Sequence, residues 1–218
     1  NGGFVKAHGG TTDTTRATGY SGARRIGVVV NTGASLNTGA GDVALYGQGF
    51  SGASGLTTGH VGVAVLGSIT TNGGNVLADG VGGSRANDGS GSSLGIVIQD
   101  ATINTSAGTG SITLRGQAGS ITGTGTGSSS GISIQGSTTG STITGGSGGI
   151  SISGSSDAGP NSGNTQGVFI AGANAGGSVI QTTGGGAIDI TGVAGTSTST
   201  NATAVQRGVQ IGNSTQVG

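Results

Sequence analysis

Residues 131–154 read GISIQGSTTGSTITGGSGGISISG, with no acid, no base and no aromatic ring. Ile alternates with Ser or Thr in three short runs, and glycine-rich stretches separate the runs. An apolar residue at every second position is typical of a β-strand with one buried face. Because these side chains offer so little chemistry, the regular pattern is the main information that the segment carries.

The same arrangement recurs along the chain, which predicts a repeat protein. The opening Gly-apolar-x-apolar returns as GVVV at Gly27, GVAV at Gly62, GIVI at Gly95, GISI at Gly131, GVFI at Gly167 and GVQI at Gly208. Second clusters follow as SLNT, SITT, TINT, TITG and VIQT, and third clusters as DVALYG, NVLADG, SITLRG, GISISG and AIDITG. A tail of Gly, Ser, Asn and Thr, expected to vary in length, separates each third cluster from the next repeat.

Strand, corner, strand, corner, strand and a long connection describe one rung of a parallel β-solenoid. We therefore expect an all-β fold of about six rungs of about 36 residues, each with three short strands plus one long variable loop. A β-sandwich is the alternative, but it does not require three clusters to return in register. The positions expected to face the core are Val28, Val30, Leu36, Val43, Leu45, Val63, Val65, Ile69, Val76, Ala78, Ile96, Ile98, Ile103, Ile112, Leu114, Ile132, Ile134, Ile143, Ile150, Ile152, Val168, Ile170, Ile180, Ile188 and Ile190.

The pattern predicts a single solenoid region over residues 1–218. Its repeats are expected near 27–61, 62–94, 95–130, 131–166 and 167–207, with half repeats at 1–26 and 208–218. The opening GGFVKAHG matches the third cluster GGNVLADG, and the closing GVQIGNSTQVG matches a first and a second cluster. Joined end to start, the halves make one more copy. We therefore expect a window of a longer array, continued covalently or by head-to-tail stacking.

The composition narrows the class of protein. The chain has 218 residues, of which 54 are Gly, one is Pro and none is Cys, and its formal net charge is zero. One proline is incompatible with collagen, and the alternation of the apolar residues argues against a disordered linker. With a net charge of zero, the chain has no excess of positive charge that would indicate binding to nucleic acid. No apolar run is long enough to span a membrane as a helix.

These Gly-apolar-x-apolar, SIT-T and GSITL-G clusters, with their Gly/Ser/Thr/Asn tails, resemble the repeats of filamentous-haemagglutinin-type exoproteins and of autotransporter-like β-strand-repeat surface proteins. The resemblance covers the whole chain. It implies a right-handed β-helix, exported to the surface of a Gram-negative bacterium as an adhesin shaft or extracellular fibre. The partners it implies are further copies of the solenoid and, through the loops, surface glycans or neighbouring fibres.

The residues themselves single out no catalytic, cofactor-binding or metal-ligating position, so an enzyme is not expected. His8 and His60 are isolated and are interpreted as surface residues. Asp42, Asp79 and Asp189 occupy three different offsets within third clusters and are not expected to converge. The alternative function is a β-helix passenger domain that binds or degrades a polysaccharide.

The remaining charged residues are interpreted as solvated loop residues. Arg24 and Arg25 beside Tyr20, and Arg207, precede first clusters and are read as solubilising charges. Asp88 lies in GGSRANDGS, a segment read as a solvent-exposed loop. Because all tails would leave the solenoid at one corner, they are expected to form a ridge where a glycan or fibre contact would sit.

Overall fold

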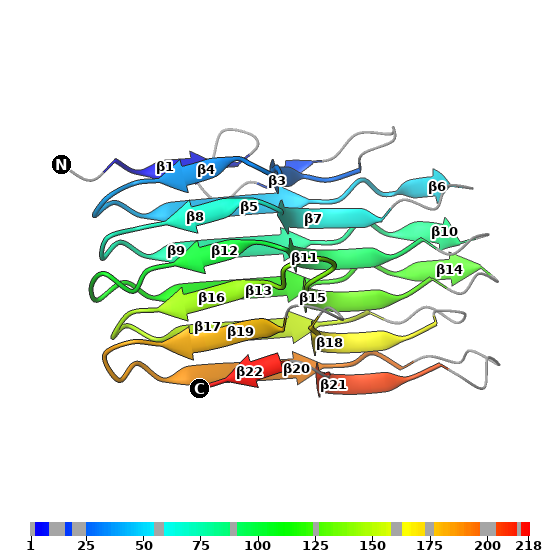
Figure 1. Ribbon diagram of the computed structural model, residues 1–218. Coiled ribbons are helices and arrows are strands. Elements are labelled where there is room, and N and C mark those ends of the chain that lie inside the picture. The colour runs from blue at the N-terminus through cyan, green and yellow to red at the C-terminus, as the bar shows by residue number, and fades with distance from the viewer. Residues whose placement is uncertain are drawn as a thin grey trace.

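The computed structural model describes residues 3–8, 16–18, 25–54, 59–87, 91–123, 127–157, 163–172, 177–196, 204–212 and 215–218. Over these residues the chain forms strands and no helix, and it winds about five times into a parallel β-solenoid (Figure 1). The successive rungs lie one above the other, with the N-terminal rung at the top of the view and the C-terminal rung at the bottom.

Three sheets run along the solenoid, one for each cluster of the repeat. The first sheet contains β3 (Val28–Val30), β7 (His60–Val65), β11 (Ser93–Gln99), β15 (Ser129–Gln135), β18 (Thr165–Ile170) and β21 (Gln206–Ile211). The second contains β4 (Ser35–Asn37), β8 (Ser68–Thr70), β12 (Thr102–Asn104), β16 (Thr142–Gly145), β19 (Ser178–Thr182) and β22 (Thr215–Val217). The third contains β1 (Val5–Ala7), β5 (Val43–Gln48), β9 (Val76–Val81), β13 (Ile112–Gln117), β17 (Ile150–Ser155) and β20 (Ile188–Val193), with β2 (Ala17–Thr18) also paired to β5.

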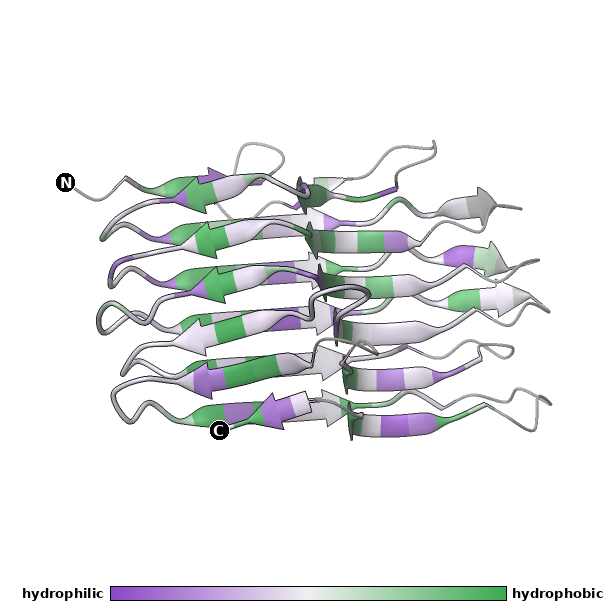
Figure 2. Cartoon of the chain, in the orientation of Figure 1, coloured by the Kyte–Doolittle hydropathy of each residue, from purple (hydrophilic) through white to green (hydrophobic). Residues whose placement is uncertain are grey.

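The predicted register is confirmed by the strand pairing. In the first sheet, Val28, Val63, Ile96, Ile132, Val168 and Val209 form one continuous column. Of the positions expected to face the core, all are buried except Leu36, Ile188 and Ile190, which are partly buried and pack against the core. Figure 2 shows the result as hydrophobic bands that line up from β4 through β8, β12, β16 and β19. Identical positions therefore stack one rung apart, as the period-two alternation requires.

The strands nearest the two ends of the chain also stack in register on their neighbouring rungs. Val5 pairs with Val43 and Ala7 with Leu45, so β1 extends the third sheet. At the other end, β21 and β22 extend the first and second sheets beyond β18 and β19.

The long connection is more regular than the sequence indicates. The interval from a third cluster to the next first cluster is 20 positions in three repeats, from Val43 to Val63, from Val76 to Ile96 and from Ile112 to Ile132. The corner between first and second clusters varies more, from 5 positions (Val63 to Ser68) to 11 (Val168 to Val179).

The reason is a small fourth sheet, β6 (Gly52–Ser54), β10 (Arg85–Asn87) and β14 (Ile121–Gly123), which pairs in parallel within these connections. Its hydrogen bonds hold successive connections in register, so they are more than a variable loop.

Glycine pairs join the third and first sheets where each connection leaves the core. A Cβ built on Gly80 would lie 2.1 Å from the carbonyl oxygen of Gly95, and one built on Gly116 would lie 2.2 Å from that of Gly131. Only a residue without a side chain allows the two backbones to approach so closely. The connections project beyond these contacts as a second lobe, here called the tail lobe, which contains β6, β10 and β14 and stands to the right in Figure 1.

Candidate functional site

A buried polar column runs through the tail lobe. His60, Ser93, Ser129 and Thr165 are register partners in the first sheet, and each has 0% of its surface exposed. Each side chain bonds a carbonyl of a connection: His60 Nδ1 with Phe50, Ser93 Oγ with Gly83 at 3.0 Å, Ser129 Oγ with Asp157 at 3.0 Å and Thr165 Oγ1 with Gly195 at 3.2 Å. These bonds satisfy buried polar groups and tie the lobe to the solenoid.

The sequence carries a signal for this column, and it lies outside the three strand clusters of the repeat. Every member lies two residues before the glycine that opens a first cluster, in HVG, SLG, SSG and TQG. A polar residue at a fixed offset from a repeated glycine indicates a position that stacks along the axis.

The structure corrects the interpretation of His60 as a surface residue. Its Nε2 lies 2.8 Å from Arg25 Nη1. Because a guanidinium only donates, Nε2 accepts, and the ring proton is on Nδ1, facing the Phe50 carbonyl. Burial of the ring, reinforced by the charges of Arg25 and Arg85, lowers the pKa of His60, although the Phe50 carbonyl acts in the opposite direction. His60 is therefore held neutral inside the tail lobe.

Arg25 is also buried rather than solubilising. It has 6% of its surface exposed, and its guanidinium carbon lies 5.6 Å from the centre of the Phe50 ring, a cation–π distance. Arg85, on β10, is buried as well, whereas Arg207 is exposed as expected. Tyr20, Arg24 and Asp88 lie outside the described residues.

The three third-cluster acids have different neighbours in the structure. Asp79 is paired in register with Tyr46 and Arg115, whereas Asp189 is paired with Ser151. Asp42 accepts a hydrogen bond from the backbone amide of Asn75 at 2.6 Å. In the ranges given above, no three His, Cys, Asp or Glu side chains form a group that could hold a metal ion.

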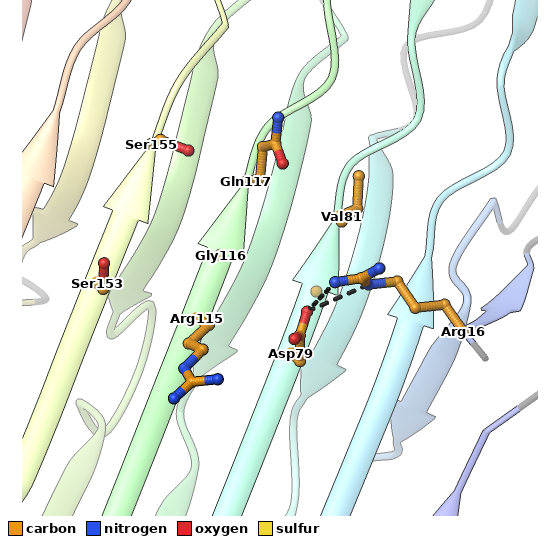
Figure 3. A pocket seen from close by; sticks show the side chains of 9 residues that line it. Arg16, Asp79, Val81, Arg115, Gly116, Gln117, Ser153 and Ser155 are labelled. Atoms are coloured by element: carbon orange, nitrogen blue, oxygen red, sulfur yellow. Dashed lines mark hydrogen bonds and ion pairs between the residues drawn. The ribbon is translucent and has the colours of Figure 1, made fainter. Parts of the chain in front are cut away.

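The outer face of the third sheet carries a shallow polar groove of about 250 Å³ (Figure 3). Arg16 reaches across to Asp79, with Nη2 and Nε of the guanidinium at 2.5 Å and 3.2 Å from Oδ1. Arg115 extends from the next strand without joining this pair. Gln117, Ser153 and Ser155 also line the groove, together with the apolar side chain of Val81. The groove offers a guanidinium, an amide and two hydroxyls, which can donate hydrogen bonds to an anionic or polyhydroxyl ligand.

Asp100 organises the long corner between β15 and β16. It has a positive φ of 48°, and its Oδ1 accepts from the backbone amides of Ser137, Thr138 and Thr139, each at 3.0 Å, and of Gly140 at 3.2 Å. The Ser137 hydroxyl donates to Oδ2. The hydroxyl, together with these amides, holds the pKa of the Asp100 carboxyl well below its usual range. The carboxylate belongs to one rung and the amides to the next, so the contact is structural.

The two ends of the solenoid are open sheet edges with exposed apolar side chains. Within the part of the chain that the structure describes, the large hydrophobic residues that are exposed are Phe4, Val29, Val193, Val209, Ile211 and Val217. All lie in end strands or directly beside one. We call the edge formed by β1, β3 and β4 the N-terminal face and the edge formed by β20, β21 and β22 the C-terminal face.

Comparison with family models, with curated proteins and with solved structures finds no match for this chain. No helix long and apolar enough to cross a membrane occurs in the described ranges.

Proposed function

We propose that the chain is a structural unit of a secreted bacterial surface fibre or adhesin shaft, extended along the solenoid axis by further rungs. The observation that carries this proposal is that, among the described residues, the exposed large apolar side chains lie only in the end strands or directly beside one. Unpaired parallel edges with apolar side chains favour the addition of another strand layer. Further rungs would cover both faces with the same pairing that already runs through the molecule.

The uniform core supports a mechanical function. Its three sheets are each continuous from the first rung to the last, and the core is a set of aliphatic columns. In such an array every rung is stabilised by its neighbours, so length can grow without any new kind of contact. In this proposal the fibre is extracellular, and its outer faces meet surface glycans or neighbouring fibres.

Electron microscopy of native material tests the proposal. Antibodies against the chain should label filaments at the bacterial surface, and fibre diffraction should give an axial repeat close to about 4.8 Å. Labelling confined to globular particles, or to the cell interior, would contradict a fibre function.

The groove on the third sheet favours a second candidate function, the binding of an acidic polysaccharide. In the described part of the chain Arg115 is exposed and has no hydrogen-bond or ion-pair partner, and it lies beside Ser153 in register. A carboxylate or sulfate group would bind the guanidinium, and neighbouring sugar hydroxyls would bind Gln117 and the serines.

Two substitutions that each remove one positive charge test whether the groove binds the polysaccharide. Arg115→Gln should weaken binding to an immobilised acidic polysaccharide by more than about tenfold, the loss expected for one charge-assisted contact. Arg207→Gln removes an exposed arginine outside the groove and should leave binding unchanged. Equal losses in both variants would indicate general charge attraction and exclude a specific groove.

A further inference from the structure

The C-terminal face of this chain has the strand layout that would continue its own N-terminal face. The last strands are β20, β21 and β22, in the third, first and second sheets, and the first strands are β1, β3 and β4 in the same three sheets. We infer that the C-terminal face binds the N-terminal face of a second copy, with β20 on β1, β21 on β3 and β22 on β4. The inference rests on the proposed fibre function for its setting and specifies the partner and the register.

The apolar columns would continue across such a junction. In the third sheet, the column that begins at Val5 ends at Ile188, and the column that begins at Ala7 ends at Ile190. Docking would therefore place Ile188 and Ile190 against Val5 and Ala7 of the next copy. In the first sheet, the columns that end at Val209 and Ile211 begin at Val28 and Val30. Ile211 is 52% exposed, so a second copy would cover the apolar side chains that the open end leaves in water.

Opposite charges lie at the two ends of a single column. Lys6 begins a column of the third sheet that continues through Ala44, Leu77, Thr113 and Ser151 and ends at Asp189. Asp189 is exposed and has no hydrogen-bond or ion-pair partner among the described residues. Docking in the unshifted register therefore places the Asp189 carboxylate beside the Lys6 ammonium of the next copy, whose amine lies 5.7 Å from the centre of the Tyr46 ring.

The charge arrangement also selects the orientation. A pairing of two C-terminal faces has Asp189 on both sides and Lys6 on neither, and a pairing of two N-terminal faces has the reverse, so neither symmetric pairing can form this ion pair. Head-to-tail docking is heterologous, and because each added copy presents a new C-terminal face, it forms an open filament.

The absence of cysteine from the chain allows a direct test of register. The column of the second sheet that begins at Ser35 ends at Gln216, and both side chains are exposed. Cysteines at both positions, in the variant Ser35→Cys/Gln216→Cys, would face each other across the junction at a separation suited to a disulfide.

Mild oxidation of this full-length variant should give a ladder of covalent oligomers on a non-reducing gel, and a reducing agent should collapse it to monomer. The matched control is Asn37→Cys/Gln216→Cys, which shifts one cysteine by two residues along the same strand and should give no ladder. A ladder from both variants would indicate unspecific contact, and a ladder from neither would mean that the faces do not dock. Either result overturns the inference.

A charge exchange provides an independent measurement on the cysteine-free chain. Asp189→Lys should raise the concentration needed for half-maximal assembly, measured by light scattering, by more than about tenfold because like charges then face each other. The double variant Lys6→Asp/Asp189→Lys exchanges the charges and should restore assembly. Failure of the double variant to assemble better than Asp189→Lys overturns the predicted pairing.

The experiments distinguish failure of the fibre function from failure of the docking between copies. Native surface filaments together with no cross-linking would leave the fibre function intact and exclude docking of copies in this register. Cross-linking of the purified chain together with no native filaments would retain the docking register and exclude the fibre function.

Discussion

His60 lies between two basic side chains inside the tail lobe, where a second proton would be unfavourable. Arg25 donates to its Nε2 at 2.8 Å, and the ring has no exposed surface. Protonation would place a cation against a guanidinium and remove the acceptor that Arg25 uses. The fold therefore depends on the neutral form of this residue.

Acidification below about pH 6.5 should lower the free energy of unfolding, because His60 has a lowered pKa in the folded chain and an ordinary one in the unfolded chain. In this window the unfolded state binds more protons, so stability is retained above the unfolded pKa and lost as the pH falls. The slope should reach up to about 1.4 kcal/mol per pH unit. Urea unfolding at pH 7.5 and pH 5.0 measures it.

Substitution of the two histidines separates their contributions. His60→Gln should flatten the dependence of the free energy of unfolding on pH. His8→Gln, which removes the only other histidine, is the matched control. An unchanged slope in His60→Gln would contradict the predicted dependence on the neutral ring.

At the scale of strands and corners, two kinds of contact hold neighbouring elements: glycine backbones in close approach and polar caps that join one rung to the next. The glycine contacts bring the third sheet against the first, and Asp100 fixes the corner before β16. Neither contact adds apolar area, yet each sets where a strand can lie.

Gly116→Ala should destabilise the chain by about 3 kcal/mol, the upper end of the usual cost of overpacking. The new Cβ would meet the Gly131 carbonyl oxygen at 2.2 Å, and backbone on both sides of the contact prevents relaxation. Gly3→Ala is the control, since a Cβ there would have no atom within 4 Å. Thermal unfolding followed by circular dichroism compares the two variants, and similar midpoints would contradict the close contact between the sheets.

Asp100→Asn should loosen the corner that its carboxylate caps. The four backbone amides of residues 137–140 lose a charged acceptor, so their hydrogen exchange should accelerate by more than about tenfold. The same acceleration should appear in the unsubstituted chain only at strongly acidic pH, since the pKa of Asp100 is lowered and its capping is lost as the pH falls. Asp189→Asn is the control and should leave these amides unchanged.

At the scale of the whole molecule, stability is expected to be graded along the axis. Strands in the middle have a neighbour on each side, whereas the strands of the two end faces, β1, β3, β4, β20, β21 and β22, each lack one. In a one-dimensional array the ends open first because each rung is held only by its neighbours.

Hydrogen exchange of the monomeric chain should therefore be slowest in β11, β12 and β13 and fastest in β1 and β22. In the disulfide-linked oligomers, β1 and β22 should gain protection while the middle strands change little. Uniform protection along the monomer would contradict the rung-by-rung account of its stability.

The sequence by itself determined the columns of the core. The alternation at Val28/Val30 or Ile132/Ile134 predicts which face of a strand is buried, and the recurrence of the cluster predicts which strands stack. The sequence alone is enough for both because both are local patterns. Only the tertiary structure decided the tail lobe, the burial of His60 and the reach of Asp100 to the following rung. Those features depend on which distant polar and glycine residues become neighbours once the rungs are stacked. The polar residue two positions before each first-cluster glycine marks the stacked column. It does not record which connection covers His60, or that the Asp100 side chain reaches the next rung.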